Sequence, residues 1–276
     1  SSPVFAGDRI FLTATEGGRL VTLALDRSSG KVLWRQALER SETAKLHHET
    51  DSATPTPATD GTNVYVFFHE AGVVSYDPEG RERWRHPLGP FRNFYGIAAS
   101  PVLAGSRLLV ACDQALGSFV LALDKHTGKP LWRTERPTRR ESYTTPVLYP
   151  STSAPRELLV YGSRSIDAYD LATGKAAWTL GGVAAVPVAS PLLADGLLFG
   201  KAEQPHGGGV ETLDDAAGVE GHDALRRIAQ DGLQALLACV DLLAHAAEGL
   251  DQILGLRGLH GGQCRVRVTP RLRLER

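Results

Sequence analysis

Residues 122–132 read ALDKHTGKPLW, and the pattern returns at 168–178 as AYDLATGKAAW. A third copy occupies 24–34, and a fourth copy at 75–84 has a turn that is one residue shorter. Each copy repeats an aspartate, a glycine and a tryptophan, with the tryptophans 50, 48 and 46 residues apart: Asp26, Gly30, Trp34; Asp77, Gly80, Trp84; Asp124, Gly128, Trp132; Asp170, Gly174, Trp178. Self-similarity at such a period indicates a repeat architecture.

A second motif recurs in phase with the first. A serine or threonine followed by proline precedes an apolar stretch five times, at Pro3, Pro57, Pro101, Pro146 and Pro191. Two motifs that repeat in phase predict a single structural unit of about 45 residues, built four times and begun a fifth time.

The second repeat shows what the unit contains. We expect a short strand through 56–58 with its proline just inside, a turn at 60–61, and strands over 63–68, 72–76 and 81–85. Four antiparallel strands at this period predict the blade of an all-β propeller. Within the signature turn, the aspartate is expected to accept backbone N–H bonds and the glycine to adopt positive φ. The tryptophan is expected to cover the junction with the next blade.

These motifs resemble the tryptophan-docking repeat of pyrroloquinoline-quinone-type (quinoprotein-like) β-propellers. That superfamily includes quinone-dependent alcohol dehydrogenases and the outer-membrane assembly lipoprotein family. The resemblance covers residues 1–200, which we interpret as a partial propeller of four blades and an aborted fifth. It implies a periplasmic or cell-envelope location. We find no signal peptide in the chain and expect the natural N-terminus to be removed or to lie upstream.

Residues 201–276 form an atypical tail that is rich in Ala, Leu and Arg and lacks aromatic residues. An apolar stripe predicts a helix over 222–254. The tail is either a genuine helical appendage or a non-native segment. Four blades would leave open edges, which favour self-association.

Composition excludes several classes of function. The formal net charge is −1, so we expect no nucleic-acid partner. No apolar run is long enough for a transmembrane segment. Cys112, Cys239 and Cys264 form no C-x-x-C pair, which argues against a structural zinc site.

One rim of the propeller carries the links between blades and the loops between second and third strands. The resemblance to quinone-dependent relatives implies that ligands bind at this rim. Adjacent His47 and His48 point apart on regular structure, so a metal site there is disfavoured. Arginines at this rim would suit an anion. The residues on this rim that are candidates for binding a protein partner or a small ligand are His48, Asp51, His69, Arg92, Asn93, Tyr95, Asp113, Arg139, Tyr143 and Arg164.

Quinone-dependent relatives use adjacent cysteines, a calcium site and a catalytic aspartate. The chain has no adjacent cysteine pair, and all four tryptophans belong to the repeat. We therefore expect no catalytic residues, no metal and no cofactor, and a non-catalytic binding or scaffold module. The alternatives are a fragment of a quinone-dependent oxidoreductase, with pyrroloquinoline quinone and calcium, or the sensor domain of a larger signalling protein.

Overall fold

A computed structural model describes residues 1–40, 46–48, 50–149, 156–194 and 197–199. These residues all lie in the first of the two parts into which the chain divides, 1–220 and 221–276. The tail expected at 201–276 and its helix over 222–254 lie outside the described residues.

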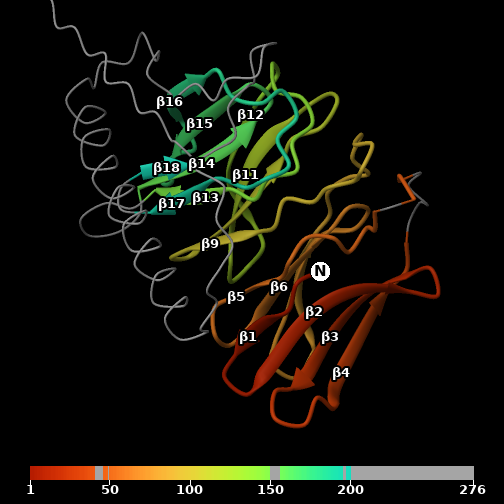
Figure 1. Ribbon diagram of the computed structural model, residues 1–276. Coiled ribbons are helices and arrows are strands. Elements are labelled where there is room, and N and C mark those ends of the chain that lie inside the picture. The colour runs from red at the N-terminus through yellow and green to blue at the C-terminus, as the bar shows by residue number, and fades with distance from the viewer. Residues whose placement is uncertain (41–45, 49, 150–155, 195–196, 200–276) are drawn as a thin grey trace, which may run out of the picture. The chain divides into compact units, whose positions relative to one another are not determined.

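The described residues form four four-stranded antiparallel sheets and one two-stranded sheet, which confirms the all-β propeller architecture (Figure 1). Within each sheet, consecutive strands are neighbours. Blade 1 contains β1 (Val4–Ala6), β2 (Arg9–Glu16), β3 (Arg19–Asp26) and β4 (Val32–Leu38). Blade 2 contains β5 (Ala58–Thr59), β6 (Val64–Phe68), β7 (Gly72–Tyr76) and β8 (Glu82–His86). Blade 3 contains β9 (Val102–Ala104), β10 (Arg107–Cys112), β11 (Phe119–Asp124) and β12 (Pro130–Glu135). Blade 4 contains β13 (Val147–Tyr149), β14 (Glu157–Gly162), β15 (Ser165–Asp170) and β16 (Ala176–Gly181), and β17 (Leu192–Ala194) pairs with β18 (Leu197–Phe199).

The signature turn joins the third and fourth strands of each blade as expected. In blade 3, the Asp124 carboxylate accepts bonds from the Thr127 backbone N–H at 2.8 Å and the Thr127 hydroxyl at 2.9 Å. These bonds hold the pKa of Asp124 below its usual value. Gly128 has a φ of +71°, which glycine adopts without a Cβ penalty. The turn is therefore closed by the two residue types that recur in the sequence.

Each tryptophan of the first three blades docks on the signature glycine of the next blade. The indole of Trp34 lies so close to Gly80 that a Cβ there would be 2.7 Å from it, and its Nε1 donates to the Pro78 carbonyl at 2.8 Å. Trp84 makes the equivalent contact with Gly128, and Trp132 with Gly174. The expected role of tryptophan at the junction between blades is confirmed.

The serine or threonine before Pro57, Pro101, Pro146 and Pro191 takes part in hydrogen bonds that link successive repeats. The Thr56 N–H donates to Ser100 Oγ at 2.9 Å, and the Ser100 N–H donates to Thr145 Oγ1 at 3.1 Å. The strand expected over 56–58 begins only at Ala58, so Pro57 precedes the strand instead of lying inside it. Proline is suited to this position because its missing N–H falls outside the strand ladder.

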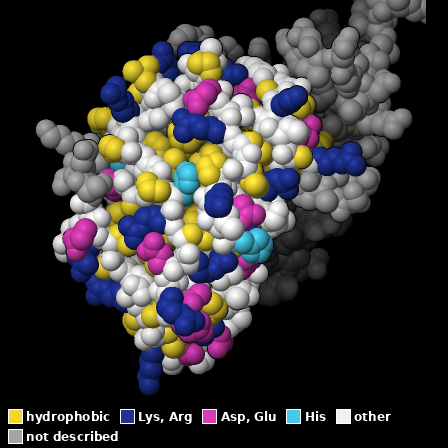
Figure 2. Space-filling view, turned by 180° about the vertical axis from the view of Figure 1, so that it is seen from behind, with side chains coloured by type: hydrophobic (Ala, Val, Ile, Leu, Met, Phe, Trp, Pro, Cys, Tyr) yellow, Lys and Arg dark blue, Asp and Glu magenta, His cyan; other side chains and the backbone are white. Residues whose placement is uncertain are grey.

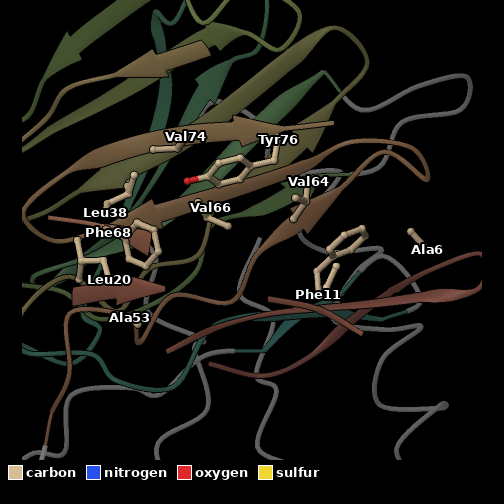
Figure 3. Close-up of a cluster of buried hydrophobic side chains, with 11 residues drawn as sticks. Ala6, Phe11, Leu20, Leu38, Ala53, Val64, Val66, Phe68, Val74 and Tyr76 are labelled. Atoms are coloured by element: carbon tan, nitrogen blue, oxygen red, sulfur yellow. The ribbon is translucent and has the colours of Figure 1, made fainter. Parts of the chain in front are cut away.

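Apolar side chains of adjacent sheets fill the space between blades. Between blades 1 and 2, Phe11 and Leu20 pack against Val64, Phe68 and Tyr76, and all five are almost completely buried (Figure 3). Similar clusters separate blade 2 from blade 3 and blade 3 from blade 4. The sheets are therefore held face to face, and their loops are fixed at two opposite rims.

Candidate functional site at the link rim

All the predicted binding residues lie on the loops of one rim, which we call the link rim. It consists of the links between blades and the turns between second and third strands. His48 and Asp51 lie in the first link, and His69 in the β6–β7 turn; Arg92, Asn93 and Tyr95 lie in the second link, Asp113 after β10, Arg139 and Tyr143 in the third link, and Arg164 in the β14–β15 turn.

Hydrogen bonds that involve backbone groups bring the first three links together. The His47 N–H donates to the Phe94 carbonyl at 3.1 Å, and the Phe94 N–H donates to the Glu141 carboxylate at 2.9 Å. The Arg140 guanidinium donates to the Ala115 carbonyl at 2.6 Å. Loops that are about 45 residues apart in sequence therefore form one continuous surface.

Aromatic rings run across this surface. His48 contacts His47 with ring centroids 4.2 Å apart, His47 contacts Tyr95 at 4.9 Å, and Tyr95 contacts Tyr143 at 5.6 Å. Phe94 packs edge-on against Tyr95 at 4.8 Å and is 59% exposed. We call these five side chains the aromatic row. Within the row, His48, Phe94 and Tyr95 are exposed, whereas Tyr143 is buried. Exposed aromatic rings that are held in place by neighbouring rings provide contact area for a protein partner.

The aromatic row continues into a shallow hollow of about 200 Å³ in the first link. His47, His48 and Asp51 line it together with Arg40 and Ser52. Asp51 accepts a hydrogen bond from the Ala53 N–H at 2.7 Å and one from the Thr15 hydroxyl of blade 1. Asp51 thus anchors the first link to blade 1.

Beneath the surface, a buried ion-pair network joins blades 3 and 4. Arg136 donates to both carboxylate oxygens of Asp113, at 2.7 and 3.0 Å, and to Asp167 at 2.9 Å. Arg139 donates to both oxygens of Asp167, at 2.7 and 2.8 Å. Arg136 also contacts the Tyr169 hydroxyl. Because both aspartates are occupied by arginine, this network is suited to fixing the rim.

The pKa values in this network are set by burial and by the pairing of each aspartate with arginine. Burial opposes ionisation of Asp167, but hydrogen bonds from Arg139 and the charge of Arg136 outweigh it and lower its pKa. Burial likewise opposes the charge on Arg136, and Asp113 raises its pKa above the usual value. Burial raises the pKa of Asp113 above its ordinary value, although the charge and hydrogen bonds of Arg136 oppose this shift. The lowered pKa of Asp167 and the raised pKa of Arg136 keep this pair ionised at neutral pH.

Other predicted residues have mainly structural contacts. The Asn93 amide donates to the Asp113 carbonyl at 2.7 Å, and His69 Nδ1 accepts the Ile97 N–H at 3.1 Å within the packed interior. The Arg164 N–H donates to the Ala184 carbonyl. Arg139 is engaged with Asp167, and anion binding by rim arginines stays a prediction.

Sequence reasoning missed Arg136, Asp167 and Phe94, and it weighed His47 only as a metal ligand. One signal was present for Asp167, which lies three residues before the signature aspartate of its repeat. The same position holds Leu23, Val74 and Leu121 in the other blades. A charged residue at a repeatedly apolar strand position indicates a buried partner.

Surface charge is mixed in sign. Figure 2 shows basic and acidic side chains interspersed on one face, with hydrophobic side chains between them. Within the described part of the chain, no helix is long and apolar enough to cross a membrane.

Among the described residues, no three His, Cys, Asp or Glu side chains group where a metal ion could be held. Cys112 is completely buried, and burial raises the pKa of its thiol. The indoles of Trp34, Trp84 and Trp132 lie in the blade junctions.

Comparison with known proteins places the chain in a family context. A family model described as outer membrane protein assembly factor BamB matches residues 1–119 and 69–227. The outer membrane protein assembly factor BamB of Xanthomonas campestris pv. campestris is 29% identical over 141 residues, which cover 51% of this chain and 32% of the relative. The quinohemoprotein alcohol dehydrogenase ADH IIB of Pseudomonas putida is 26% identical over 137 residues, covering 48% of this chain and 19% of the relative.

A solved structure shows the same fold. The crystal structure of BamB from Moraxella catarrhalis superposes with a TM-score of 0.53 at 14% identity, covering 72% of this chain and 55% of that one. The chain thus spans about a third of the length of the BamB relative and about half of the solved structure.

Proposed function

The chain belongs to the family described as outer membrane protein assembly factor BamB, and from this membership we propose its function. We propose that the chain is a non-catalytic protein-binding module in the cell envelope and that its link rim contacts proteins that assemble the outer membrane. The relative from Xanthomonas campestris pv. campestris carries this role in its name.

The observation that carries the proposal is the contrast between the exposed rings of the aromatic row and the buried, paired charges of blades 3 and 4. Phe94 and Tyr95 are exposed and held by neighbouring rings. In contrast, Asp113 and Asp167 are paired with Arg136, so these carboxylates are poorly placed to act as general bases. Exposed, ordered aromatic side chains above a rigid base are typical of protein-binding surfaces.

Site-specific photo-cross-linking tests the proposal. A photoreactive phenylalanine analogue at position 95 is expected to cross-link the chain to outer membrane assembly proteins in isolated envelopes. The control is the same analogue at position 131, because Leu131 is exposed on β12 at the opposite rim. Equal cross-linking from both positions, or none from position 95, would contradict the proposal.

A quinone-dependent oxidoreductase is the second candidate, favoured by the likeness to the Pseudomonas putida dehydrogenase. Reconstitution with pyrroloquinoline quinone and calcium distinguishes the two. The binding module predicts no bound quinone absorbance and no alcohol oxidation. Stoichiometric quinone binding that requires calcium would favour the enzyme.

A further inference from the structure

A buried histidine fastens the second link to blade 2. His69 lies in the β6–β7 turn and is only 1% exposed. Its Nδ1 accepts the Ile97 N–H at 3.1 Å, and its own N–H donates to the Ser52 carbonyl at 3.3 Å. His69 therefore joins the first link, the second link and the turn of blade 2.

The second link packs closely around this imidazole. A Cβ built on Gly96 would lie 3.6 Å from Nδ1 of His69, and the ring centroids of Phe91 and His69 are 5.7 Å apart. Ile97 is almost completely buried in the apolar cluster between blades 2 and 3. The bond between Ile97 and His69 therefore lies in the packed interior, where an N–H without an acceptor is costly.

The two halves of the second link are held by different chemical groups. The first half is held by an amide, because the Arg92 N–H donates to the Gln114 side chain at 2.9 Å. The second half is held by the imidazole, through the Ile97 N–H. Tyr95 of the aromatic row lies only two residues before Ile97. Loss of the bond to His69 would therefore free the part of the link that carries Tyr95.

The third link is fastened by groups that do not titrate near neutral pH. The hydroxyls of Ser142 and Thr144 both donate to the Tyr161 carbonyl, at 2.6 and 2.8 Å. A hydroxyl keeps its proton in acid, whereas an imidazole nitrogen accepts a hydrogen bond only while it is unprotonated. Of these three bonds, only the one at His69 therefore depends on pH in the acidic range.

The surroundings of His69 favour its neutral form. Burial lowers the pKa of His69, and the charge of Arg40, which follows β4, acts in the same direction. Glu70 on the same turn opposes this shift, but Arg40 is paired with it. Phe91 and Ile97 of the second link bring no charge to the imidazole. Protonation therefore favours a state in which His69 has left the interior.

We propose that protonation of His69 releases the second link from blade 2 and weakens partner binding at the aromatic row. A protonated Nδ1 points a hydrogen atom at the Ile97 N–H and cannot accept from it. Tyr95 then loses its fixed place beside Tyr143 of the third link, where the ring centroids are 5.6 Å apart. The effect on binding rests on the proposed function, whereas the release of the link is a property of the chain alone.

Nuclear magnetic resonance of the full chain tests the release without any partner. The pH is lowered from about 7.5 to about 4.5, which extends well below the ordinary histidine pKa of about 6.5. Amide exchange, corrected for its intrinsic dependence on pH, should show that Ile97 loses protection as the imidazole of His69 becomes protonated. The buried Leu109 of β10 should stay protected over the same range.

His69→Asn is the matched variant for this measurement, because asparagine offers an acceptor that does not titrate. In His69→Asn the Ile97 amide should stay protected in acid. Three results would each overturn the proposal: protection of Ile97 that does not change in the wild-type chain, the same loss in His69→Asn, or loss of protection at Leu109 together with Ile97.

The effect on binding is measured with the purified chain and the outer membrane assembly proteins at both ends of this pH range. The affinity of the wild-type chain should fall by about tenfold or more in acid, and that of His69→Asn by less than about threefold. His126→Asn, on the exposed signature turn of blade 3, should keep the wild-type dependence. Equal dependence on pH in the wild-type chain and His69→Asn would refute the switch. Absence of binding already at about pH 7.5 would instead refute the proposed function, and the amide exchange of Ile97 would still decide whether the link is released.

Discussion

Gly174→Ala is expected to destabilise the chain far more than the same change at Gly30. Both glycines have almost the same positive φ, +70° and +68°, so alanine strains both backbones by about 1–2 kcal/mol. At Gly174 the new methyl group also collides with the indole of Trp132. That indole is held by its hydrogen bond to the Leu171 carbonyl at 3.0 Å and by the packed junction around it.

The additional cost has two parts. Forcing an extra methyl group into a packed junction costs about 1–3 kcal/mol, and loss of the indole hydrogen bond costs about 1 kcal/mol. Gly174→Ala should therefore lower the free energy of unfolding by about 2–4 kcal/mol more than Gly30→Ala. Urea unfolding at a concentration where the chain is monomeric measures both changes.

A double variant isolates the collision. When Trp132→Ala removes the indole, Gly174→Ala should cost no more than Gly30→Ala does in the wild-type chain. Equal costs of Gly174→Ala and Gly30→Ala in the wild-type chain would refute the view that tryptophan docking closes the blade junctions.

Three other variants test the junctions and the buried groups. Trp132→Ala should lower the free energy of unfolding by about 3–5 kcal/mol, and a loss below about 1 kcal/mol in urea would show that this indole does not hold blades 3 and 4 together. Asp167→Asn should cost about 3 kcal/mol at pH 7. The pKa of Asp167 is lower in the folded chain than its unfolded value of about 4, so the Asp167 carboxylate stabilises the fold above that pH. This stabilisation disappears as the pH falls through the folded pKa, so the unfolding free energies of the variant and the wild type should converge in acid. A difference that stays constant with pH would contradict the assignment. His69 has a lowered pKa because it is buried, so wild-type stability should fall as the pH drops below about 6.5, where the unfolded chain binds the proton first. His69→Asn keeps an acceptor for the Ile97 N–H and should reduce that slope in pH-dependent melting, whereas unchanged slopes would exclude His69 as the cause.

Local sequence rules predicted most of the fold. The aspartate and glycine of each signature turn act within a few residues, so the turn at 124–128 could be recognised without tertiary information. The alternation of apolar residues likewise indicated the strands around it. The ends of the strands were predicted less accurately. For example, the Thr56 N–H donates to Ser100 in the next blade and not to a neighbouring strand of its own blade, so the strand begins only at Ala58.

The site was less accessible from sequence. The ten candidate residues were placed on one rim by topology, but which of them are exposed depends on partners across the blade junctions. Arg136 meets Asp167, 31 residues away, only when blades 3 and 4 pack together. His47 and Phe94 joined the aromatic row through contacts between separate links. Periodicity gives the position of such residues but not their partners.

Binding of the purified chain to the outer membrane assembly proteins, measured with rim variants, tests the central claim most directly. The double variant Phe94→Ala, Tyr95→Ala removes two exposed side chains of the aromatic row. The matched control Leu33→Ala, Leu131→Ala removes two exposed side chains from the outer strands β4 and β12. The account predicts at least tenfold weaker binding for the rim variant, as for loss of a central aromatic contact, and wild-type affinity for the control. Wild-type affinity in the rim variant, or an equal loss in both, would contradict it.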